Sequence, residues 1–284
     1  MQVKFHADEQ YRFCDGVPVE AFTYTEYSIE PHDHGFYEVN IVLAGTGTHC
    51  IENGRFPVRR GDVFVIPPSV IHAYVETAGL EVYHILLKKS FLEENREESQ
   101  RVPGFLQLVE IEPFLRGNSS GAYFLHLSHS QLQQLEADLS LIDQNSPFVN
   151  QTAMKLHTVW KLLYWFSALL NAQLQDIAQK SVHRYEMQIL RVLEYMHTHY
   201  GEKVTIAQLC KDVYLSRSTF LRGFQVVCGV APMEYLTEYR CKKAREFLRE
   251  AACSKTEIAH RCGFYDLSHM ERCLKKYGSV ESAE

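Results

Sequence analysis

Three histidines and one glutamate near the N-terminus have the types and the spacing of a metal site or a polar-ligand site. His32 and His34 lie two residues apart, so both side chains point to one face of a strand. Glu38 has the same parity, but a straight strand would carry it roughly 13 Å beyond His34, so a bend near Gly35 is needed. His72 would arrive from a separate strand. If the strands close into a barrel, the four side chains converge on its interior.

This donor set is compatible with two kinds of site. Imidazole together with carboxylate suits divalent manganese, iron, nickel or zinc, and four protein ligands leave coordination room for a bound molecule. Without a metal, the same groups could hydrogen-bond the hydroxyls of a small polar ligand. A divalent transition metal is therefore a possible cofactor rather than a required one, and the ligand is not identified by the residue types.

The region around these residues has the pattern of short strands. Runs rich in Val, Ile, Phe, Tyr and Thr alternate with turn residues over residues 20–87. Asn53-Gly54 lies between two such runs and predicts a two-residue hairpin, because both residues tolerate positive φ. Arg60-Gly61-Asp62 predicts another turn, and Pro67-Pro68 ends the strand after it. Many short strands with few helices indicate a sandwich or small barrel.

The middle of the chain has the pattern of a helical hairpin. A flexible loop is predicted from Arg116 to Gly121. Ser128 and Gln131 then form a capping box, and a second helix is predicted from about Val149 to Ile177. The first helix carries an apolar stripe at three-four spacing, made of Leu132, Leu135, Leu139 and Ile142. Packing against the β domain and a dimer interface are equally good interpretations of this hairpin.

A second chemical pattern is an internal repeat near the C-terminus. Thr205 with Gln208 and Ser254 with Glu257 form capping boxes 49 residues apart, and each begins a short helix. A tight turn follows each helix, and Ser216 and Asp266 are natural N-caps for the helices after those turns. Two capped helices around a turn, found twice, predict a tandem helix-turn-helix.

Charge and length make double-stranded DNA a suitable partner for this repeat. The whole chain has a formal net charge of −6, yet residues 203–276 hold 14 basic and 8 acidic side chains. Such a segment is typical of a polyanion partner, although a solvated helical surface would also have it. A helix from Met233 to Ala251 would be about 28 Å long, close to one DNA turn of about 34 Å. The second helix of each unit could then enter one of two successive major grooves.

Basic residues of those second helices have the chemistry to contact DNA. Arg222 and Arg272 can each donate two hydrogen bonds to guanine O6 and N7. Lys275 and Lys276 are better placed to contact phosphates.

These motifs resemble known families. His32, His34, Glu38 and Gly45 are similar to the first cupin motif, and the run from Gly61 to His72 is similar to the second, with Ser69 in place of a glycine. Residues 183–278 look like the DNA-binding domain of the AraC/XylS transcription regulators. The motifs that carry this resemblance are Ile206-Ala207-Gln208-Leu209, Leu215-Ser216-Arg217-Ser218, Gly229-Val230-Ala231-Pro232, Ala244-Arg245-Glu246-Phe247-Leu248, Glu257-Ile258-Ala259 and Gly263-Phe264.

The resemblance implies a multidomain fold. An N-terminal all-β cupin barrel (a double-stranded β-helix) would sense a ligand over residues 1–120. Residues 121–180 would form the helical hairpin, with dimerisation and linker roles, and residues 181–284 an all-α DNA-binding domain with two helix-turn-helix units. His32, His34, Glu38 and His72 match the cupin metal ligands. The DNA contacts implied by position and chemistry are Arg217, Ser218, Leu221, Arg222, Ser268, His269, Glu271, Arg272, Lys275 and Lys276.

The function that the resemblance implies is a sequence-specific transcription regulator, expected to be an activator and a homodimer. It would respond to a small polar effector such as a sugar, and RNA polymerase is a possible further partner. The alternative is a cupin-type metalloenzyme, an oxygenase or isomerase, with a helical appendage. That alternative leaves the repeat and the basic segment without a purpose, so no enzymatic activity is expected.

Composition narrows the setting. Hydrophobic residues make up 46% and charged residues 23%, which excludes wholesale disorder. Charges in the first residues do not suit a signal peptide, and the most apolar stretch, Leu156–Leu170, is shorter than the roughly 20 residues of a membrane span. None of the eight cysteines forms a CxxC pair, which favours reduced thiols. A cytoplasmic protein without a membrane partner is expected.

Overall fold

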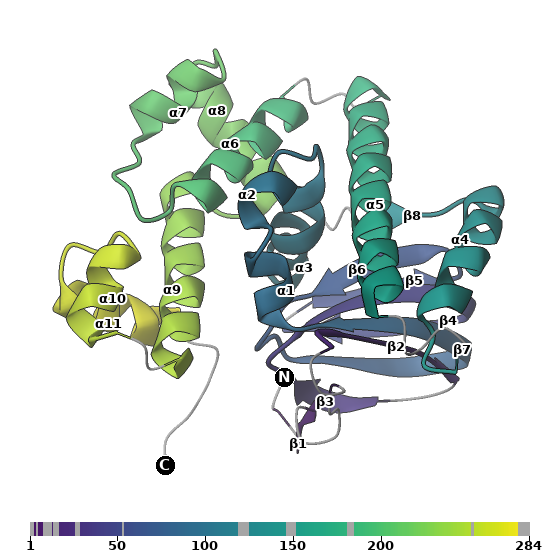
Figure 1. The fold of residues 1–284 in the computed structure, drawn as a ribbon. Helices are drawn as coiled ribbons and strands as arrows, with labels where there is room; N and C mark the ends of the chain where they lie inside the picture. Colours follow the sequence, from purple (N-terminus) through teal and green to yellow (C-terminus); the bar gives the residue numbers. More distant parts are fainter. Residues whose placement is uncertain are drawn as a thin grey trace. The chain divides into compact units, whose positions relative to one another are not determined.

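The computed structural model describes residues 3, 5–7, 13, 17–25, 29–52, 54–118, 125–145, 152–180, 185–250 and 253–277. The chain divides into two compact units, Met1–Ile177 and Ala178–Glu284, and each is described by itself (Figure 1). The helical residues 129–142 and 152–177 therefore fall in the same unit as the strands.

The first unit is built on a mostly antiparallel sheet, to which the described residues contribute eight strands. The order along the sheet is β1-β3-β7-β4-β6-β8, with β2 also paired to β7 and β5 to β4. The strands are β1 (Phe5–His6), β2 (Val19–Thr25), β3 (Ile29–Asp33), β4 (Tyr37–Ile51), β5 (Gly54–Arg59), β6 (Asp62–Ile66), β7 (His72–Leu87) and β8 (Leu125–His126).

Two long strands bend and thereby close the sheet into the predicted cupin-like barrel. One half of β7 pairs with β2 and the first half of β4, and the other half pairs with β3 and the second half of β4. Register shifts between Val42 and Thr48 mark the bend. At this point Gly45 has a φ of +71°, and a Cβ there would lie 2.1 Å from the carbonyl oxygen of Gly79. Only glycine permits this crossing, which explains the glycine of the first cupin motif.

The predicted hairpin exists, but its turn lies one residue earlier than expected. Ile51 pairs with Gly54, so the turn begins at Glu52 and Gly54 already belongs to β5. Glu52 has a φ of +47°, while Asn53 lies outside the described residues. The register is set by side-chain burial, because it turns Phe56 and Val58 towards the barrel core.

The first unit also contains several helices, all of which follow β7 in the sequence. They are α1 (Lys89–Glu93), α2 (Arg96–Ser99), the π-helical turn η2 (Gln107–Ile111), α3 (Glu112–Asn118), α4 (His129–Ile142) and α5 (Thr152–Lys180). The loop predicted from Arg116 was wrong at its start, because Arg116 lies in α3 with 1% of its surface exposed. Residues 119–124 lie outside the described residues.

The hairpin helices pack within their own unit. The capping box of α4 is confirmed, and the predicted apolar stripe is buried. The Tyr83 hydroxyl on β7 donates to the Leu139 carbonyl of α4 over 3.1 Å. On α5, Trp160 stacks on Phe91 of α1 with ring centroids 4.7 Å apart. The apolar stripe of α4 is therefore buried within the chain, as the interpretation of packing against the β domain predicts.

The second unit contains the predicted tandem helix-turn-helix. Its helices are α6 (Glu186–Thr198), α7 (Ile206–Asp212), α8 (Arg217–Cys228), α9 (Pro232–Glu250), α10 (Lys255–Arg261) and α11 (Leu267–Lys276). The long helix α9 contacts α8 and also both α10 and α11 (Figure 1). The predicted architecture of an all-β barrel followed by an all-α domain is therefore confirmed.

The four predicted N-caps of the repeat are confirmed, with one difference. The side chains of Thr205, Ser216, Ser254 and Asp266 each accept a hydrogen bond from the first turn of their helices. Only the box at Ser254 is reciprocal in the way the sequence predicts, because Gln208 instead donates to the Tyr195 hydroxyl of α6. None of the helices in the described part of the chain is both long enough and apolar enough to cross a lipid bilayer.

Candidate functional site

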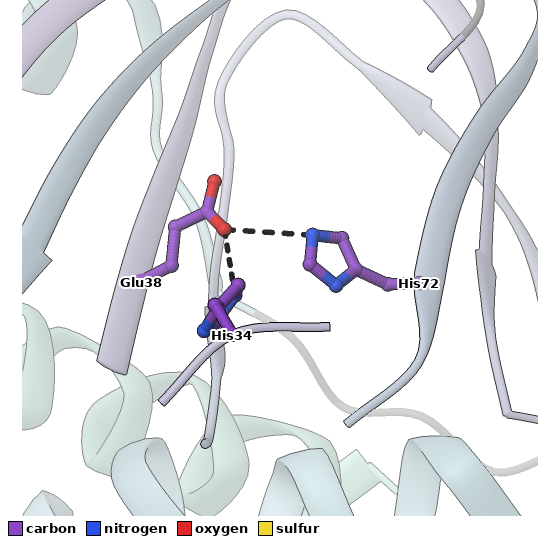
Figure 2. Close-up of side chains that lie close together, drawn as sticks. All are labelled: His34, Glu38 and His72. Atoms are coloured by element: carbon purple, nitrogen blue, oxygen red, sulfur yellow. Dashed lines mark ion pairs between the residues drawn. The ribbon is translucent and has the colours of Figure 1, made fainter. Parts of the chain in front are cut away.

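Three of the four predicted barrel ligands lie close enough together to hold one metal ion. These are His34, Glu38 and His72, and all three are buried. Glu38 Oε2 lies 3.0 Å from His34 Nε2 and 3.4 Å from His72 Nε2, and dashed lines mark both pairs in Figure 2. The predicted bend occurs at Gly35 and Phe36, where β3 gives way to β4. The bend brings His34 and Glu38 together although a straight strand would separate them.

Backbone carbonyls fix the orientation of the histidine rings. Nδ1 of His34 donates to the Phe36 carbonyl over 2.7 Å, and Nδ1 of His72 donates to the Val70 carbonyl over 3.3 Å. Because a carbonyl oxygen can only accept, each Nδ1 carries the proton and each neutral ring keeps a lone pair on Nε2. Metal-binding histidines in proteins are held in this way.

The fourth predicted ligand is close by but outside this group. His32 donates from Nδ1 to the Glu30 carbonyl over 2.9 Å, and its ring centroid is 4.1 Å from that of His72. A residue that the sequence reasoning missed is His84 on β7, whose Nδ1 donates to Glu38 Oε1 over 2.5 Å. His84 has the same parity as His72 within one strand, and that signal could have revealed it.

Burial and hydrogen bonding set the protonation of the cluster. Burial lowers the pKa of His72 to about 4 and also lowers the pKa of His32. Burial acts to raise the pKa of Glu38, but the imidazoles of His34, His72 and His84 around the carboxylate outweigh it and hold that pKa well below its usual range. At neutral pH the buried carboxylate is charged while the ring of His72 is neutral. A divalent cation requires ligands in this state.

The residues present fit a divalent transition metal. The cavity beside the cluster has a volume of about 20 Å³, enough for one ion or one water molecule. His34 Nε2 is buried without a hydrogen-bond partner and faces the Glu38 carboxylate, so two acceptors confront each other. A cation between them would satisfy both, and the mixed imidazole and carboxylate set suits a transition metal. A sugar does not fit in a cavity of this volume.

The N-terminal residues take part in closing the cavity. Ala7 lines it and is 1% exposed. The short strand β1 beside Ala7 pairs with β3, where His6 forms an ion pair with Asp33. Phe13 packs edge-on against Phe36, with ring centroids 5.6 Å apart. Access to the cluster therefore depends on where this segment lies.

A buried arginine is a second feature that sequence reasoning missed. Arg116 of α3 donates to the Val65 carbonyl over 2.6 Å and to His49 Nδ1 over 3.1 Å, and its Nε lies 2.9 Å from Glu112 Oε1. Burial lowers the pKa of His49 well below its usual value, and the charge of Arg116 lowers it further. No motif marked Arg116, since its burial depends on contacts with distant strands.

A larger pocket of about 300 Å³ lies between the sheet and α4. It could hold a small organic molecule, which the cavity beside the histidines could not. Its lining combines leucines with hydroxyl and charged side chains: Thr23, Leu43, Arg60, Tyr83, Leu132, Glu136, Leu139, Ser140 and Asp143.

The residues implied to contact DNA in the first helix-turn-helix lie mostly on the exposed face of α8. Arg217, Ser218 and Arg222 are exposed, and Leu221 is half-buried. The opposite face packs inward through aromatic residues, with Phe220 and Phe224 fully buried. The side chains available to reach DNA and those that hold the helix in place are thus separated by helical periodicity.

The second helix-turn-helix differs in two of its predicted contacts. Ser268, Glu271, Arg272 and Lys275 are exposed on α11. His269 is instead half-buried, with its ring edge-on to Phe264 at 5.5 Å, so it stabilises the turn. Lys276 donates to the Tyr277 hydroxyl over 2.8 Å and lies 3.9 Å from Glu234, which competes with a phosphate contact.

Comparisons with known proteins agree with this architecture. The family models that match are the AraC-like ligand binding domain over residues 17–144 and a helix-turn-helix domain over residues 209–280. The HTH-type transcriptional activator RhaS of Escherichia coli O139:H28 is 27% identical over 249 residues, which span 86% of this chain and 83% of that protein.

Two solved structures are among those with similarity to the chain. One is the DNA-binding domain of the global transcriptional factor AdpA in complex with a target DNA, with 27% identity and a TM-score of 0.32, covering 33% of this chain and 84% of that chain. Another is ToxT of Vibrio cholerae with a bound unsaturated fatty acid, with 13% identity and a TM-score of 0.38, covering 95% of both chains.

The order of the domains and the two family matches lead to one conclusion. A cupin-like barrel precedes a tandem helix-turn-helix, each matches the corresponding family model, and similarity to a transcriptional activator covers both. The chain belongs to the AraC family of DNA-binding transcription regulators and carries the N-terminal ligand-binding domain of that family.

Proposed function

We propose that this regulator responds to a small polar effector, such as a sugar, and that its barrel holds a divalent transition metal at His34, Glu38 and His72. The observation that carries the proposal is the convergence of two imidazole Nε2 atoms on one buried carboxylate, at 3.0 and 3.4 Å. A bound divalent ion would supply a Lewis acid to which effector oxygen atoms can attach. His32 and His84 lie beside the cluster as further polar contacts for effector hydroxyls.

Effector binding requires the cavity to enlarge. At about 20 Å³ the cavity admits no organic molecule, so the segment that carries Ala7 must shift when an effector enters. The segment is held by β1 and by the ion pair of His6 with Asp33. We therefore propose that the effector changes the position of this segment and, through it, the activity of the regulator.

Metal content tests the proposal directly. The protein is purified without a chelator, and its metal is measured by mass spectrometry beside the variants Glu38→Gln and His72→Gln. We expect close to one equivalent of a transition metal in the wild type and a loss of it in both variants, because each removes a ligand. His126→Gln is the matched control, since His126 is 39% exposed and pairs with Asp62 instead. A wild type that binds no manganese, iron, nickel or zinc on titration contradicts the metal assignment.

The location of the effector has its own test. Candidate sugars and other polyols are screened by thermal shift on the wild type and on Glu136→Ala, a variant in the larger pocket beside α4. A stabilising compound should lose its effect in His72→Gln and keep it in Glu136→Ala. The reverse pattern places the effector beside α4 and contradicts the assignment to the barrel.

Activation, a homodimer and contact with RNA polymerase complete the proposal. They are supported by the kind of protein that the chain is similar to, a transcriptional activator. Sedimentation with and without the effector tests the dimer, and transcription from a bound promoter tests activation. We propose no catalytic activity, and metal-dependent turnover of a hydroxylated compound would contradict that.

A further inference from the structure

The short segment Tyr200–Glu202, which we call the strap, connects the two helix-turn-helix units outside α9. In the sequence it lies between α6 and α7, directly before the first helix-turn-helix. In space, the ring of Tyr200 packs against the hydrophobic cluster of the second helix-turn-helix. That cluster is formed by Cys241, Ala244, Ile258, Ala259, Cys262, Phe264 and Met270. The strap therefore contacts a core to which it does not belong in sequence.

Two glycines allow the strap to approach so closely. A Cβ on Gly201 would lie 2.6 Å from the carbonyl oxygen of Arg261, the last residue of α10. Gly263, in the turn of the second helix-turn-helix, has a φ of +73°. A Cβ there would lie 2.7 Å from the carbonyl oxygen of Tyr200. A side chain at either position would push the strap away from the second helix-turn-helix.

One arginine of α9 fastens the strap. Arg240 donates from Nε to the Tyr200 carbonyl over 2.7 Å and from Nη2 to the Glu202 carbonyl over 2.7 Å. Its Nη2 would lie 2.8 Å from a Cβ on Gly263, so the guanidinium also lies against the turn of the second helix-turn-helix. A planar guanidinium holds two acceptors in a fixed geometry, which a single ammonium cannot do.

We infer that Arg240 is a positioning residue that fixes the second helix-turn-helix relative to the first, and thereby the spacing of the two DNA sub-sites that one chain reads. A single helix between two units sets their separation but permits bending at its ends. The strap adds a second attachment, because it contacts α10, the turn at Gly263 and α9 together. With both attachments, α8 and α11 keep one relative orientation before DNA is bound, so less entropy is lost on binding.

The experiment selects DNA from a random double-stranded library with the full chain. The proteins compared are the wild type, Arg240→Ala, and Arg249→Ala as the matched control. Arg249 also lies on α9 but is exposed, so its removal takes away the same charge without touching the strap. We expect the wild type and Arg249→Ala to enrich two sub-motifs at a single spacing of about one DNA turn. Arg240→Ala should enrich the same sub-motifs at several spacings.

Band shifts on designed DNA give the magnitude. Insertion of two base pairs between the sub-motifs rotates one sub-site by roughly 70° relative to the other. For the wild type, this should remove the base contacts of one unit and weaken binding on the order of 30-fold or more. For Arg240→Ala, the insertion should weaken binding by only a few fold. Equal penalties in the wild type and Arg240→Ala overturn the inference.

A second variant covers the case in which Arg240→Ala does not fold. Arg240→Lys keeps the charge but reaches only one carbonyl at a time, so its insertion penalty should be intermediate. A variant that loses melting temperature while keeping the wild-type penalty shows that Arg240 acts only on stability, and this also overturns the inference. If the strap has no role in spacing, all variants should enrich the sub-motifs at the same spacing. Failure of DNA binding itself would already appear in the wild type.

Discussion

His72 is predicted to make the first unit less stable as the pH falls from 7 to 5. Burial lowers its pKa from 6.5 to about 4 in the folded state, so between these values the unfolded chain binds a proton that the folded chain does not. Stability is thus fully present above pH 6.5, is lost as the pH falls, and stops changing below about pH 4. Below pH 4.5 the carboxylate of Glu38 adds a loss of the same sign, because its folded pKa is also lowered.

The size of the effect follows from the pKa difference. Each unit of difference is worth about 1.4 kcal/mol, so the full loss from His72 is about 3 kcal/mol, and about 2 kcal/mol of it falls between pH 7 and 5. His72 is 1% exposed, so solvent screening does not reduce this figure appreciably. Burial also lowers the pKa values of His32 and His49, which add to the wild-type slope. The variant His72→Gln should therefore lose about 2 kcal/mol less than the wild type over this interval.

Urea unfolding at pH 7 and pH 5 measures the difference. The only two tryptophans of the chain, Trp160 and Trp165, both lie on α5, so tryptophan fluorescence reports on the first unit. A chelator is present throughout, because the release of a bound metal at low pH would produce a loss of the same sign. His157→Gln removes an exposed imidazole from α5 and is the control. The reasoning is refuted if His72→Gln loses as much stability as the wild type, or if the wild type gains stability at pH 5.

Three further predictions concern other parts of the molecule. Gly45→Ala should destabilise the first unit by more than about 2 kcal/mol, because its Cβ would meet a carbonyl at 2.1 Å, whereas Gly79→Ala, with open space around it, should cost only about 1 kcal/mol; urea unfolding compares the two. Arg116→Leu should cost about 3–5 kcal/mol, because the buried carboxylate of Glu112 loses its partner, and adding Glu112→Leu should restore part of that loss in the same assay. Arg222→Ala on the exposed face of α8 should weaken binding to selected DNA by about 1–3 kcal/mol and relax specificity at one sub-motif, while Arg249→Ala should leave that specificity unchanged in band shifts.

Local features of the fold could be predicted from the sequence because their causes are local. The N-caps at Ser216, Ser254 and Asp266 depend on side chains within one helical turn, and all three form as expected. The helical stripe from Leu132 to Ile142 follows from periodicity alone, and it is buried. The repeat of two capped helices, and with it the DNA-binding domain, was visible in the spacing of such signals.

Features that depend on contacts between distant strands could not be predicted in the same way. The hairpin turn lies at Glu52 rather than at Gly54, because burial of Phe56 and Val58 overrides the turn preference of the Asn-Gly pair. Two of the notable buried groups, Arg116 and His84, meet partners 51 and 46 residues away in sequence. No short motif encodes such pairs.

The chemistry of the barrel shows where the two kinds of information divide. The residue types and spacing of His34, Glu38 and His72 named the cluster, since a family motif preserves them. Only the folded structure decided that the rings present their Nε2 lone pairs, that His32 lies outside the group of three, and that the cavity admits an ion but not a sugar. Sequence specifies which donors are available, whereas their directions, their protonation and the space between them arise from how bent strands pack across the barrel.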